Sequence, residues 1–426
     1  MASKNKILVL LGDGMGGRPV PELDGRTAIE AAATPALDRV ARDGACGMLS
    51  PISRGVPAGS DTSHMALLGY NPYELYRGRG PFEAKGVGLD INPGDVAFRC
   101  NFSTVDPADG RTVLDRRAGR IHSGTDQLRQ AINEQIPEID GVQILFKESV
   151  EHRCALVLRG EGINEFVTEV DPHIDPAPGQ PAEQYYDCKP LPGHEDDPEA
   201  LFTAQVVNKF VQRCFEVLNA HEVNRQRVAE GKPPANITLP RGVGTAVHLE
   251  PFATKYGLDG AIVVEVDLVR GLAMYLGMEV INAPGATGGR DSDEISIAQT
   301  VVSALANHDF ILANIKAPDL GGHDRDPEQK IAAVQKVDRA VAYLLDNLDF
   351  GSTVMMLAAD HCTPISVGDH SGDPIPTVFF GHGVTPDCVQ SYGERACAQG
   401  CMGHFLGADV MNILTNYSGS GEKFGA

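Results

Sequence analysis

Short apolar runs alternate with longer amphipathic stretches along most of this chain. Residues 6–11, 310–315 and 353–357 are continuous apolar runs, typical of strands buried on both faces of a parallel sheet. Further strands are expected at residues 260–266 and 377–380, and helices at residues 35–44, 267–278, 293–307 and 327–346. Thr34 and Pro35 are expected to be the N-cap and first residue of the first helix. The alternation predicts an α/β fold with a doubly wound, mostly parallel sheet.

The alternation stops near residue 86 and resumes near residue 254. Within the interval, strands are expected at residues 97–105, 155–158 and 236–239. Residues 171–198 are expected to be a loop rich in Pro and Asp, and residues 199–230 carry a long helical stripe. We therefore expect a doubly wound domain from residues 1–86 and 254–426, interrupted by an inserted α+β domain from residues 87–253. The length of 426 residues agrees with two domains, because it exceeds what one hydrophobic core usually supports.

Composition narrows the location and the partners. No run approaches the length of a membrane span, and the N-terminus leads directly into the first strand, so we predict a soluble, cytoplasmic protein without a signal peptide. The net charge of −21 opposes binding to nucleic acid and to anionic membranes, so an anionic substrate requires a local basic cluster. Nine scattered cysteines without CxxC spacing predict reduced thiols. The sequence leaves homo-oligomerisation open.

Carboxylate and imidazole side chains follow the three long apolar runs. Each run is followed by an aspartate, two of these aspartates have a histidine nearby, and a further histidine lies in a turn-rich segment downstream: Asp13, Asp319 with His323, Asp360 with His361, and His370. Because the carboxyl ends of parallel strands meet at one edge of a sheet, where open α/β folds bind ligands, we expect these side chains to converge.

Ser60 follows Gly59 and precedes a helical apolar pattern. This order places its hydroxyl at a helix N-terminus, where backbone N–H groups favour an anion. Two interpretations stay open: Ser60 is a simple N-cap, or it is a nucleophile. A nucleophilic serine requires activation, which a coordinated metal ion can supply by lowering the pKa of the hydroxyl.

These side chains offer enough ligands for two divalent metal ions that share one site: Asp13, Ser60, Asp319, His323, Asp360, His361 and His370. Mixed carboxylate and imidazole ligands suit Mn²⁺ or Zn²⁺, and they suit Mg²⁺ less well because Mg²⁺ prefers oxygen. Paired metal ions are a recognised device for phosphoryl transfer. The alternative, three histidines paired within the core, does not explain their association with strand-end aspartates.

Basic residues gather in the expected insertion: Arg111, Arg116, Arg117, Arg120, His152, Arg153 and Arg241. The planar guanidinium group suits phosphate and carboxylate oxygens, so the cluster is a candidate binding site for an anionic substrate. Each arginine taken alone is equally compatible with a solvated surface position or with pairing to one of the many carboxylates of this chain.

Several longer segments are distinctive. They are residues 12–15 (GDGM), 57–62 (PAGSDT), 76–84 (YRGRGPFEA), 98–102 (FRCNF), 115–120 (DRRAGR), 151–153 (EHR), 284–288 (PGATG), 322–324 (GHD), 359–361 (ADH) and 369–374 (DHSGDP). In these segments, which span the whole chain, the sequence resembles the archaeal-type 2,3-bisphosphoglycerate-independent phosphoglycerate mutases of the alkaline phosphatase superfamily.

The resemblance implies a phosphatase-like metal-binding domain with a substrate-binding insertion, and interconversion of 2-phosphoglycerate and 3-phosphoglycerate through transient phosphorylation of Ser60. It implies two ions of the Mn²⁺ class, with Zn²⁺, Co²⁺ and Mg²⁺ as alternatives, and no 2,3-bisphosphoglycerate. One ion is assigned Asp13, Ser60, Asp360 and His361, and the other Asp319, His323 and His370. The substrate-binding residues that we expect are Arg116, Arg117, Arg120, His152, Arg153, Arg241 and Arg270.

Three places depart from the pattern of the family. Arg270 stands where lysine is usual, Pro318 stands where threonine is usual, and residues 400–407, including His404 and Leu406, lack two usual arginines. Arginine and lysine are not interchangeable at a phosphate site. An alternative therefore stays open: a paralogue that acts on a phosphonate or another phosphorylated carboxylate, or a metal-dependent phosphohydrolase.

Overall fold

The computed structural model describes residues 5–173, 182–423 and 425. It divides into two compact units, one formed by Met1–Tyr76 with Leu249–Ala426, and the other by Arg77–His248. We call them the first unit and the inserted unit. Helix α5 (Gly80–Gly86) belongs to the inserted unit, ahead of the boundary placed at residue 87 from the sequence. The substrate-binding role assigned to this unit stays a prediction.

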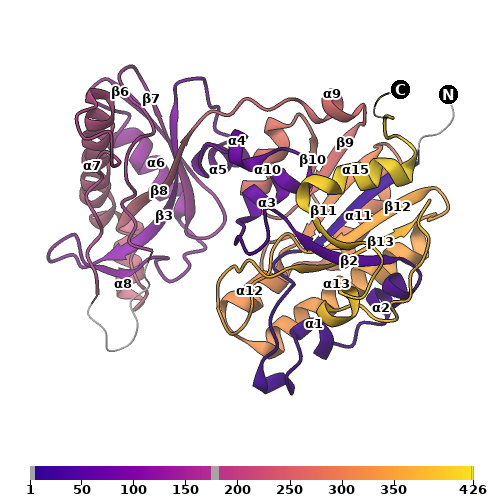
Figure 1. Ribbon diagram of the computed structural model, residues 1–426. Helices are drawn as coiled ribbons and strands as arrows, with labels where there is room; N and C mark the ends of the chain where they lie inside the picture. Colours follow the sequence, from indigo (N-terminus) through magenta and orange to yellow (C-terminus); the bar gives the residue numbers. More distant parts are fainter. Residues whose placement is uncertain (1–4, 174–181, 424, 426) are drawn as a thin grey trace. The chain divides into compact units, whose positions relative to one another are not determined.

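An eight-stranded sheet forms the centre of the first unit (Figure 1). In spatial order its strands are β10 (Glu279–Ile281), β9 (Gly260–Val263), β11 (Phe310–Ile315), β1 (Lys6–Gly12), β12 (Thr353–Ala358), β13 (Ile375–Gly381), β2 (Ala45–Ser50) and β14 (Gly403–Leu406). All neighbours are parallel except β13, which is antiparallel to both β12 and β2. The prediction of a doubly wound, mostly parallel sheet is confirmed.

Helices cover both faces of this sheet (Figure 1). They are α1 (Ala28–Ala31), α2 (Pro35–Arg42), α3 (Ser60–Leu67), α4 (Pro72–Leu75), α9 (Phe252–Tyr256), α10 (Asp267–Tyr275), α11 (Glu294–Leu305), α12 (Ala317–His323), α13 (Pro327–Asn347), α14 (Glu394–Cys397) and α15 (Gly407–Ser418). Helices α2 and α11 pack against α13, whereas α10 and α15 pack against α3. Within the described residues, no helix is long and apolar enough to cross a bilayer.

The inserted unit is built on an antiparallel sheet. Its strands are β4 (Val113–Asp115), β3 (Val96–Val105), β7 (Arg153–Arg159), β6 (Val142–Glu148) and β5 (Glu138–Ile139) in that order, with β8 (Ile237–Thr245) also paired to β3. Helices α6 (Thr125–Gln135), α7 (Pro198–Asn219) and α8 (Glu222–Ala229) complete the unit with α5. Strand alternation gives two buried faces. A large core includes Phe102, Phe146 and Phe210, and a smaller one packs Ala97 and Ala155 near α5.

The structure differs from the sequence-based expectation in several local respects. Asp319 and His323 lie on the short helix α12, not in a loop after β11. The stripe expected over residues 199–230 is two helices, because the chain turns at Ala220 and His221 between α7 and α8. Strands β2 and β6 and helix α6 were not expected. The described part of the expected loop at 171–198 contains no helix or strand until α7 begins at Pro198, and residues 174–181 lie outside the described residues.

The start of helix α2 is capped from a distance. Thr34 is the N-cap residue, as expected, but its side chain makes no capping hydrogen bond. The Oδ1 of Asp338, on α13, accepts from the backbone N–H of Ala36 at 2.8 Å and of Leu37 at 2.9 Å instead. One carboxylate therefore satisfies two unpaired donors of α2 and ties this helix to α13.

We predict that Asp338→Ala lowers the free energy of unfolding by about 1–2 kcal/mol, the usual effect of losing a helix cap. Urea unfolding followed by circular dichroism measures the loss. Asp338→Asn keeps an acceptor oxygen and should lose less than half as much. Equal losses in the two variants would contradict the capping explanation and point to the negative charge.

Candidate active site

The predicted ligands converge at one edge of the sheet of the first unit. Strands β11, β1 and β12 are adjacent and parallel, so the segments that leave their carboxyl ends emerge side by side. Asp13 follows β1, Asp360 follows β12, and Asp319 lies on α12 directly after β11. The ligand atoms form two groups, and within each group all atoms lie within 4.8 Å of one another. One group comes from Asp319, His323 and His370, and the other from Asp13, Asp319 and His361, so Asp319 belongs to both.

His361 is at the centre of one group. Its Nε2 lies 3.3 Å from the Ser60 hydroxyl, 3.4 Å from Asp360 Oδ2 and 3.6 Å from Asp13 Oδ1. All four side chains are buried. Asp319 leads the other group: its Oδ1 lies 3.3 Å from His323 Nε2 and 3.6 Å from His370 Nε2. The structure thus brings all seven predicted ligands together, and their division between two ions stays a prediction.

The histidines present the same ring nitrogen to the centre. The Nδ1 of His323 lies 3.1 Å from the Gly368 carbonyl, and the Nδ1 of His370 lies 2.8 Å from the Ala58 carbonyl. Because a carbonyl only accepts hydrogen bonds, each Nδ1 carries the proton and leaves Nε2 with a free lone pair. Burial, with His370 nearby, lowers the pKa of His361 to about 3, so His361 is neutral as a metal ligand must be.

Ser60 is the first residue of α3, and Gly59 is the N-cap. The interpretation of Ser60 as a simple N-cap is therefore wrong. Its hydroxyl points instead to His361 Nε2, in the ligand group. The chain reaches Ser60 from β2 through an irregular segment. Ser60 therefore does not follow a predicted strand directly, and the strand pattern could not place it beside the other ligands.

Close packing around Gly14 holds two of the ligand loops together. Its φ is +57°, and a Cβ there would lie 2.5 Å from the Thr363 hydroxyl and 2.7 Å from Asp319 Oδ1. Its N–H donates to Asp360 Oδ1 at 3.0 Å. Only glycine allows this approach.

Lys316 is a site residue that the sequence analysis missed. Its Nζ lies 2.9 Å from Asp13 Oδ1 and 2.7 Å from Asp319 Oδ2, and so links the two ligand groups. Burial alone would lower the pKa of Lys316, but Asp13, Asp319 and Asp360 raise it, so the ammonium is a permanent charge. The signal was present in the sequence, because Lys316 directly follows the apolar run that ends at residue 315.

The donor set fits a divalent metal ion. Asp360 Oδ2 is fully buried and makes no hydrogen bond within the described residues, although it faces His361 Nε2. A buried carboxylate oxygen without a donor is costly unless a cation completes its surroundings. Carboxylate oxygens with neutral imidazole nitrogens are the ligands that Mn²⁺ and Zn²⁺ accept.

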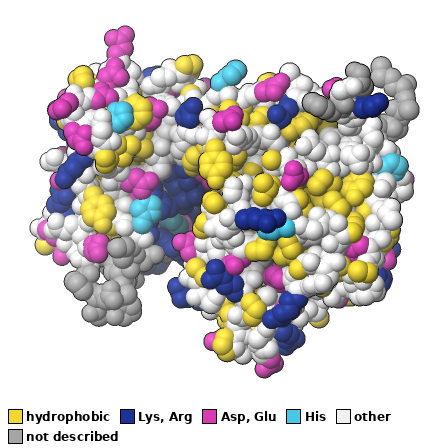
Figure 2. Space-filling model, viewed as in Figure 1, with side chains coloured by type: hydrophobic (Ala, Val, Ile, Leu, Met, Phe, Trp, Pro, Cys, Tyr) yellow, Lys and Arg dark blue, Asp and Glu magenta, His cyan; other side chains and the backbone are white. Residues whose placement is uncertain are grey.

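The inserted unit carries a separate cluster of cationic side chains, and Figure 2 shows dark blue side chains gathered on this unit. Burial, together with Arg153, Arg99, Arg117 and Arg120, lowers the pKa of His152 to about 2, which places all four arginines around a neutral imidazole. Burial lowers the pKa of Arg99, and Arg79 and Arg241 lower it as well, so both arginines are close to Arg99. We call this set, with Arg116, the arginine cluster. Arg79 and Arg99 were not predicted, although both lie in distinctive segments.

Part of the arginine cluster is neutralised within the unit. Arg116 makes a two-pronged hydrogen bond with Asp171, at 2.7 and 2.8 Å, so the alternative of carboxylate pairing holds for this arginine. Other polar atoms make no hydrogen bond to any described residue: Arg99 Nε, Arg241 Nε and His152 Nδ1 are buried, with carboxylate oxygens 3.6–3.7 Å away. Buried donors in a surplus of positive charge favour an anionic ligand.

Backbone strain concentrates beside the same cluster. Seven of the described non-glycine residues have positive φ, and four of them belong to the cluster or lie next to its members: Ala118, Arg120, Glu151 and His173. Such conformations cost of order 1–3 kcal/mol each, and proteins keep them mainly at functional sites.

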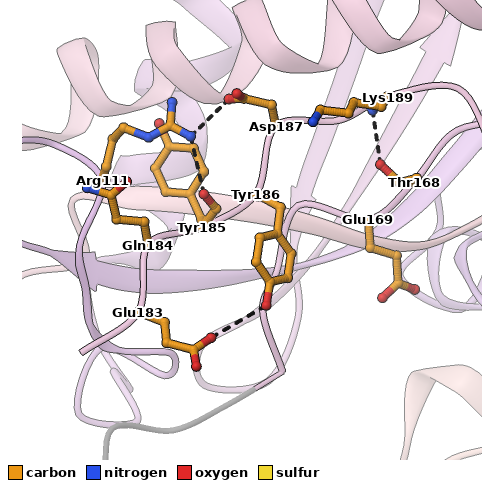
Figure 3. A pocket seen from close by; sticks show the side chains of 9 residues that line it. All are labelled: Arg111, Thr168, Glu169, Glu183, Gln184, Tyr185, Tyr186, Asp187 and Lys189. Carbon is orange, nitrogen blue, oxygen red and sulfur yellow. Dashed lines mark hydrogen bonds and ion pairs between the residues drawn. The ribbon is translucent and has the colours of Figure 1, made fainter. Parts of the chain in front are cut away.

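Arg111 and Arg270 have other surroundings. Arg111 lines a cavity of about 660 Å³ in the inserted unit (Figure 3), where it pairs with Asp187 at 2.9 Å and lies over the Tyr185 ring. Glu169 and Glu183 line the same cavity, which makes it a poor site for an anion. Arg270, on α10, lies 3.5 Å from Asp267 and donates to Asn282.

Comparison with known proteins agrees with this architecture. A family model described as 2,3-bisphosphoglycerate-independent phosphoglycerate mutase matches residues 41–224. Relatives of that name from Methanopyrus kandleri and Methanosphaera stadtmanae are both 46% identical to this chain. Each similarity covers 99% of this chain, together with 99% of the Methanopyrus kandleri protein and 100% of the Methanosphaera stadtmanae protein.

Two solved structures are similar over nearly the whole chain, both at 34% identity. A Pyrococcus horikoshii protein has a TM-score of 0.83, with 99% of this chain and 100% of that chain covered. The cofactor-independent phosphoglycerate mutase of Thermoplasma acidophilum has a TM-score of 0.65, with 97% and 100% covered.

The fold and the site define an α/β enzyme in which a serine shares a buried edge of the sheet with the predicted metal ligands. The full-length similarity to named relatives makes the assignment specific. The chain belongs to the 2,3-bisphosphoglycerate-independent phosphoglycerate mutase family.

We predict that Lys316→Met destabilises the metal-free protein by about 3–5 kcal/mol, because it leaves buried carboxylates without their partner. Added Mn²⁺ should then raise the melting temperature of the variant more than that of the wild type. Differential scanning calorimetry with and without metal measures both effects. Lys336→Met is the control: Lys336 pairs with Glu294 away from the site, and its loss should change stability by no more than about 1 kcal/mol. An unchanged metal-free stability in Lys316→Met would contradict the bridging role.

Proposed function

We propose that this protein interconverts 2-phosphoglycerate and 3-phosphoglycerate through a phosphoserine at Ser60. One observation carries the proposal: the Ser60 hydroxyl lies among the predicted ligands, 3.3 Å from His361 Nε2 and away from any capping role. The names and full-length similarity of the relatives support the same reaction.

Two divalent ions of the Mn²⁺ class complete the site in this proposal. Asp13, Ser60, Asp360 and His361 hold one, and Asp319, His323 and His370 hold the other. When bound, such ions lower the pKa of a coordinated hydroxyl and neutralise charge on a transferring phosphoryl group. Lys316 adds a fixed positive charge between Asp13 and Asp319.

The chemical sequence is a transfer and a return. Ser60 Oγ gives up its proton and forms a bond to phosphorus as the bond from phosphorus to the glycerate oxygen breaks, and that oxygen takes up one proton as it leaves. The glycerate then turns, and its other hydroxyl takes the phosphoryl group back from Ser60. Retention of the glycerate during this turn decides between isomerisation and hydrolysis.

The arginine cluster suits that retention. Arg117, Arg120, Arg153 and Arg241, with the neutral His152, are the proposed contacts to the carboxylate and phosphate of the substrate. Arg116 contributes through its ion pair with Asp171, which also orients Arg241 at 3.6 Å. Contact of Arg270 with the substrate stays a prediction.

The alternatives of a phosphonate-directed paralogue and a phosphohydrolase are not favoured, because the named relatives are mutases. Arg270, His404 and Leu406 remain the positions at which substrate preference could have changed. The cytoplasmic location and homo-oligomerisation stay predictions.

The function is tested by ³¹P NMR of metal-loaded protein mixed with 3-phosphoglycerate. We expect 2-phosphoglycerate to appear, with little inorganic phosphate. Ser60→Ala should reduce the rate by at least a thousandfold while the melting temperature of the metal-free protein changes little, because Ser60 lies at a helix end and caps nothing. Release of phosphate without isomerisation would support the phosphohydrolase, and wild-type rates in Ser60→Ala would exclude Ser60 as the nucleophile.

We also predict that chelation abolishes activity and that Mn²⁺ restores it. Elemental analysis of the restored protein should find close to two ions per chain. Metal affinity should fall as the pH is lowered, because the ligating histidines and carboxylates must be deprotonated. A preparation that is shown to be metal-free and retains full activity would rule out the metal-assisted reaction.

A further inference from the structure

Thr363 touches both ligand groups, although it is not itself a predicted ligand. Its side chain is fully buried. The hydroxyl oxygen lies 2.7 Å from Asp319 Oδ1 and 3.1 Å from His361 Nδ1. One hydroxyl therefore joins the leading residue of one group to the central residue of the other.

The Thr363 hydroxyl has a single proton and can donate it to only one of these two neighbours. Asp319 forms an ion pair with the Lys316 ammonium, whose Nζ lies 2.7 Å from Asp319 Oδ2, so Asp319 is a carboxylate. An ionised carboxylate only accepts, so Thr363 donates to Asp319. Toward His361 the hydroxyl can then only accept, and His361 Nδ1 must carry the proton.

The consequence falls on the other ring nitrogen. With Nδ1 protonated in a neutral ring, His361 Nε2 has a free lone pair that faces Ser60, Asp13 and Asp360. His323 and His370 reach the same tautomer by donating from Nδ1 to backbone carbonyls. Among the three histidines, His361 alone is oriented by a side chain, and so its tautomer depends on residue identity.

The backbone of Thr363 is itself held in place. Its N–H lies 3.2 Å from the carbonyl oxygens of both Gly14 and Gly16, and its carbonyl accepts from the buried Lys330 ammonium. The hydroxyl is thus presented from a fixed position, and it does not have to be ordered when a metal ion binds.

We propose that Thr363 is a positioning residue that fixes the His361 tautomer and the Asp319 carboxylate for metal binding. The inference rests on the proposed metal-dependent function. It predicts that the Thr363 hydroxyl, not its methyl group, sets metal affinity. Groups that orient a metal ligand in this way typically change affinity 10–100-fold when removed.

The first test needs no substitution at Thr363. In metal-free wild-type protein labelled with ¹⁵N-histidine, long-range ¹H–¹⁵N spectra distinguish the two neutral tautomers, and loss of one signal set in His361→Gln assigns His361. We expect protonated Nδ1 and unprotonated Nε2. A His361 ring protonated at Nε2 would overturn the proposal.

The second test compares Mn²⁺ affinity by calorimetric titration of the metal-free proteins. Thr363→Val should bind 10–100-fold more weakly than the wild type, and Thr363→Ser should stay within about threefold of it. Thr377→Val is the matched control, because it removes another fully buried threonine hydroxyl, which bonds only within β13. Thr377→Val should bind as the wild type does.

The outcomes separate this inference from the proposed function. Wild-type protein that binds no metal would contradict both the proposed function and the role of Thr363. Metal binding that is strong in the wild type and equally strong in Thr363→Val would overturn the role of Thr363 alone. Equal losses in Thr363→Ser and Thr363→Val would assign the effect to packing and also overturn it. If Thr363→Val does not fold, the tautomer spectrum of the wild type decides.

Discussion

Burial of three carboxylates at one edge of the sheet is the constraint on which the first unit depends. Asp13, Asp319 and Asp360 are at most 2% exposed, and removing each charge from water costs several kcal/mol before any partner is added. Lys316 is the permanent cation that touches two of them. Three buried carboxylates thus face one ammonium group. This imbalance favours a bound cation at the edge, whereas the arrangement would be a poor solution for stability alone.

The inserted unit has the opposite electrostatic problem. The arginine cluster has seven arginines, and Glu83, Glu151 and Asp171 are carboxylates that pair with some of them. Burial and neighbouring arginines lower the pKa of Arg99. An anion would relieve this repulsion, just as cations would relieve the repulsion at the sheet edge. The charge of the inserted unit therefore suits an anionic group, whereas the charge of the sheet edge in the first unit suits cations.

The sequence predicted the parts of this structure that depend on one strand and its end. Buried strands such as β11 and β12 are continuous apolar runs, and an aspartate that follows such a run lies at the carboxyl edge of the sheet. What the sequence could not give depends on long-range partners. Asp338 caps a helix some three hundred positions away, and Thr363 acquires its role only because α12 brings Asp319 to it. The strand β2 escaped notice because its small residues and short length lack a clear apolar pattern.

The fixed contacts around the ligands bear on when the site forms. Lys330 is fully buried, with its pKa lowered to about 8 by burial, and its ammonium donates to the carbonyls of Gly14, Gly16 and Thr363. It thereby joins the segments after β1 and β12 with protein groups alone. Two of the histidines are oriented by backbone carbonyls, which belong to Gly368 and Ala58. In the proposed function, metal ions would therefore meet ligands that the protein already holds in place. Their binding energy would go into stabilising the native state, and little of it would be needed to order the ligands.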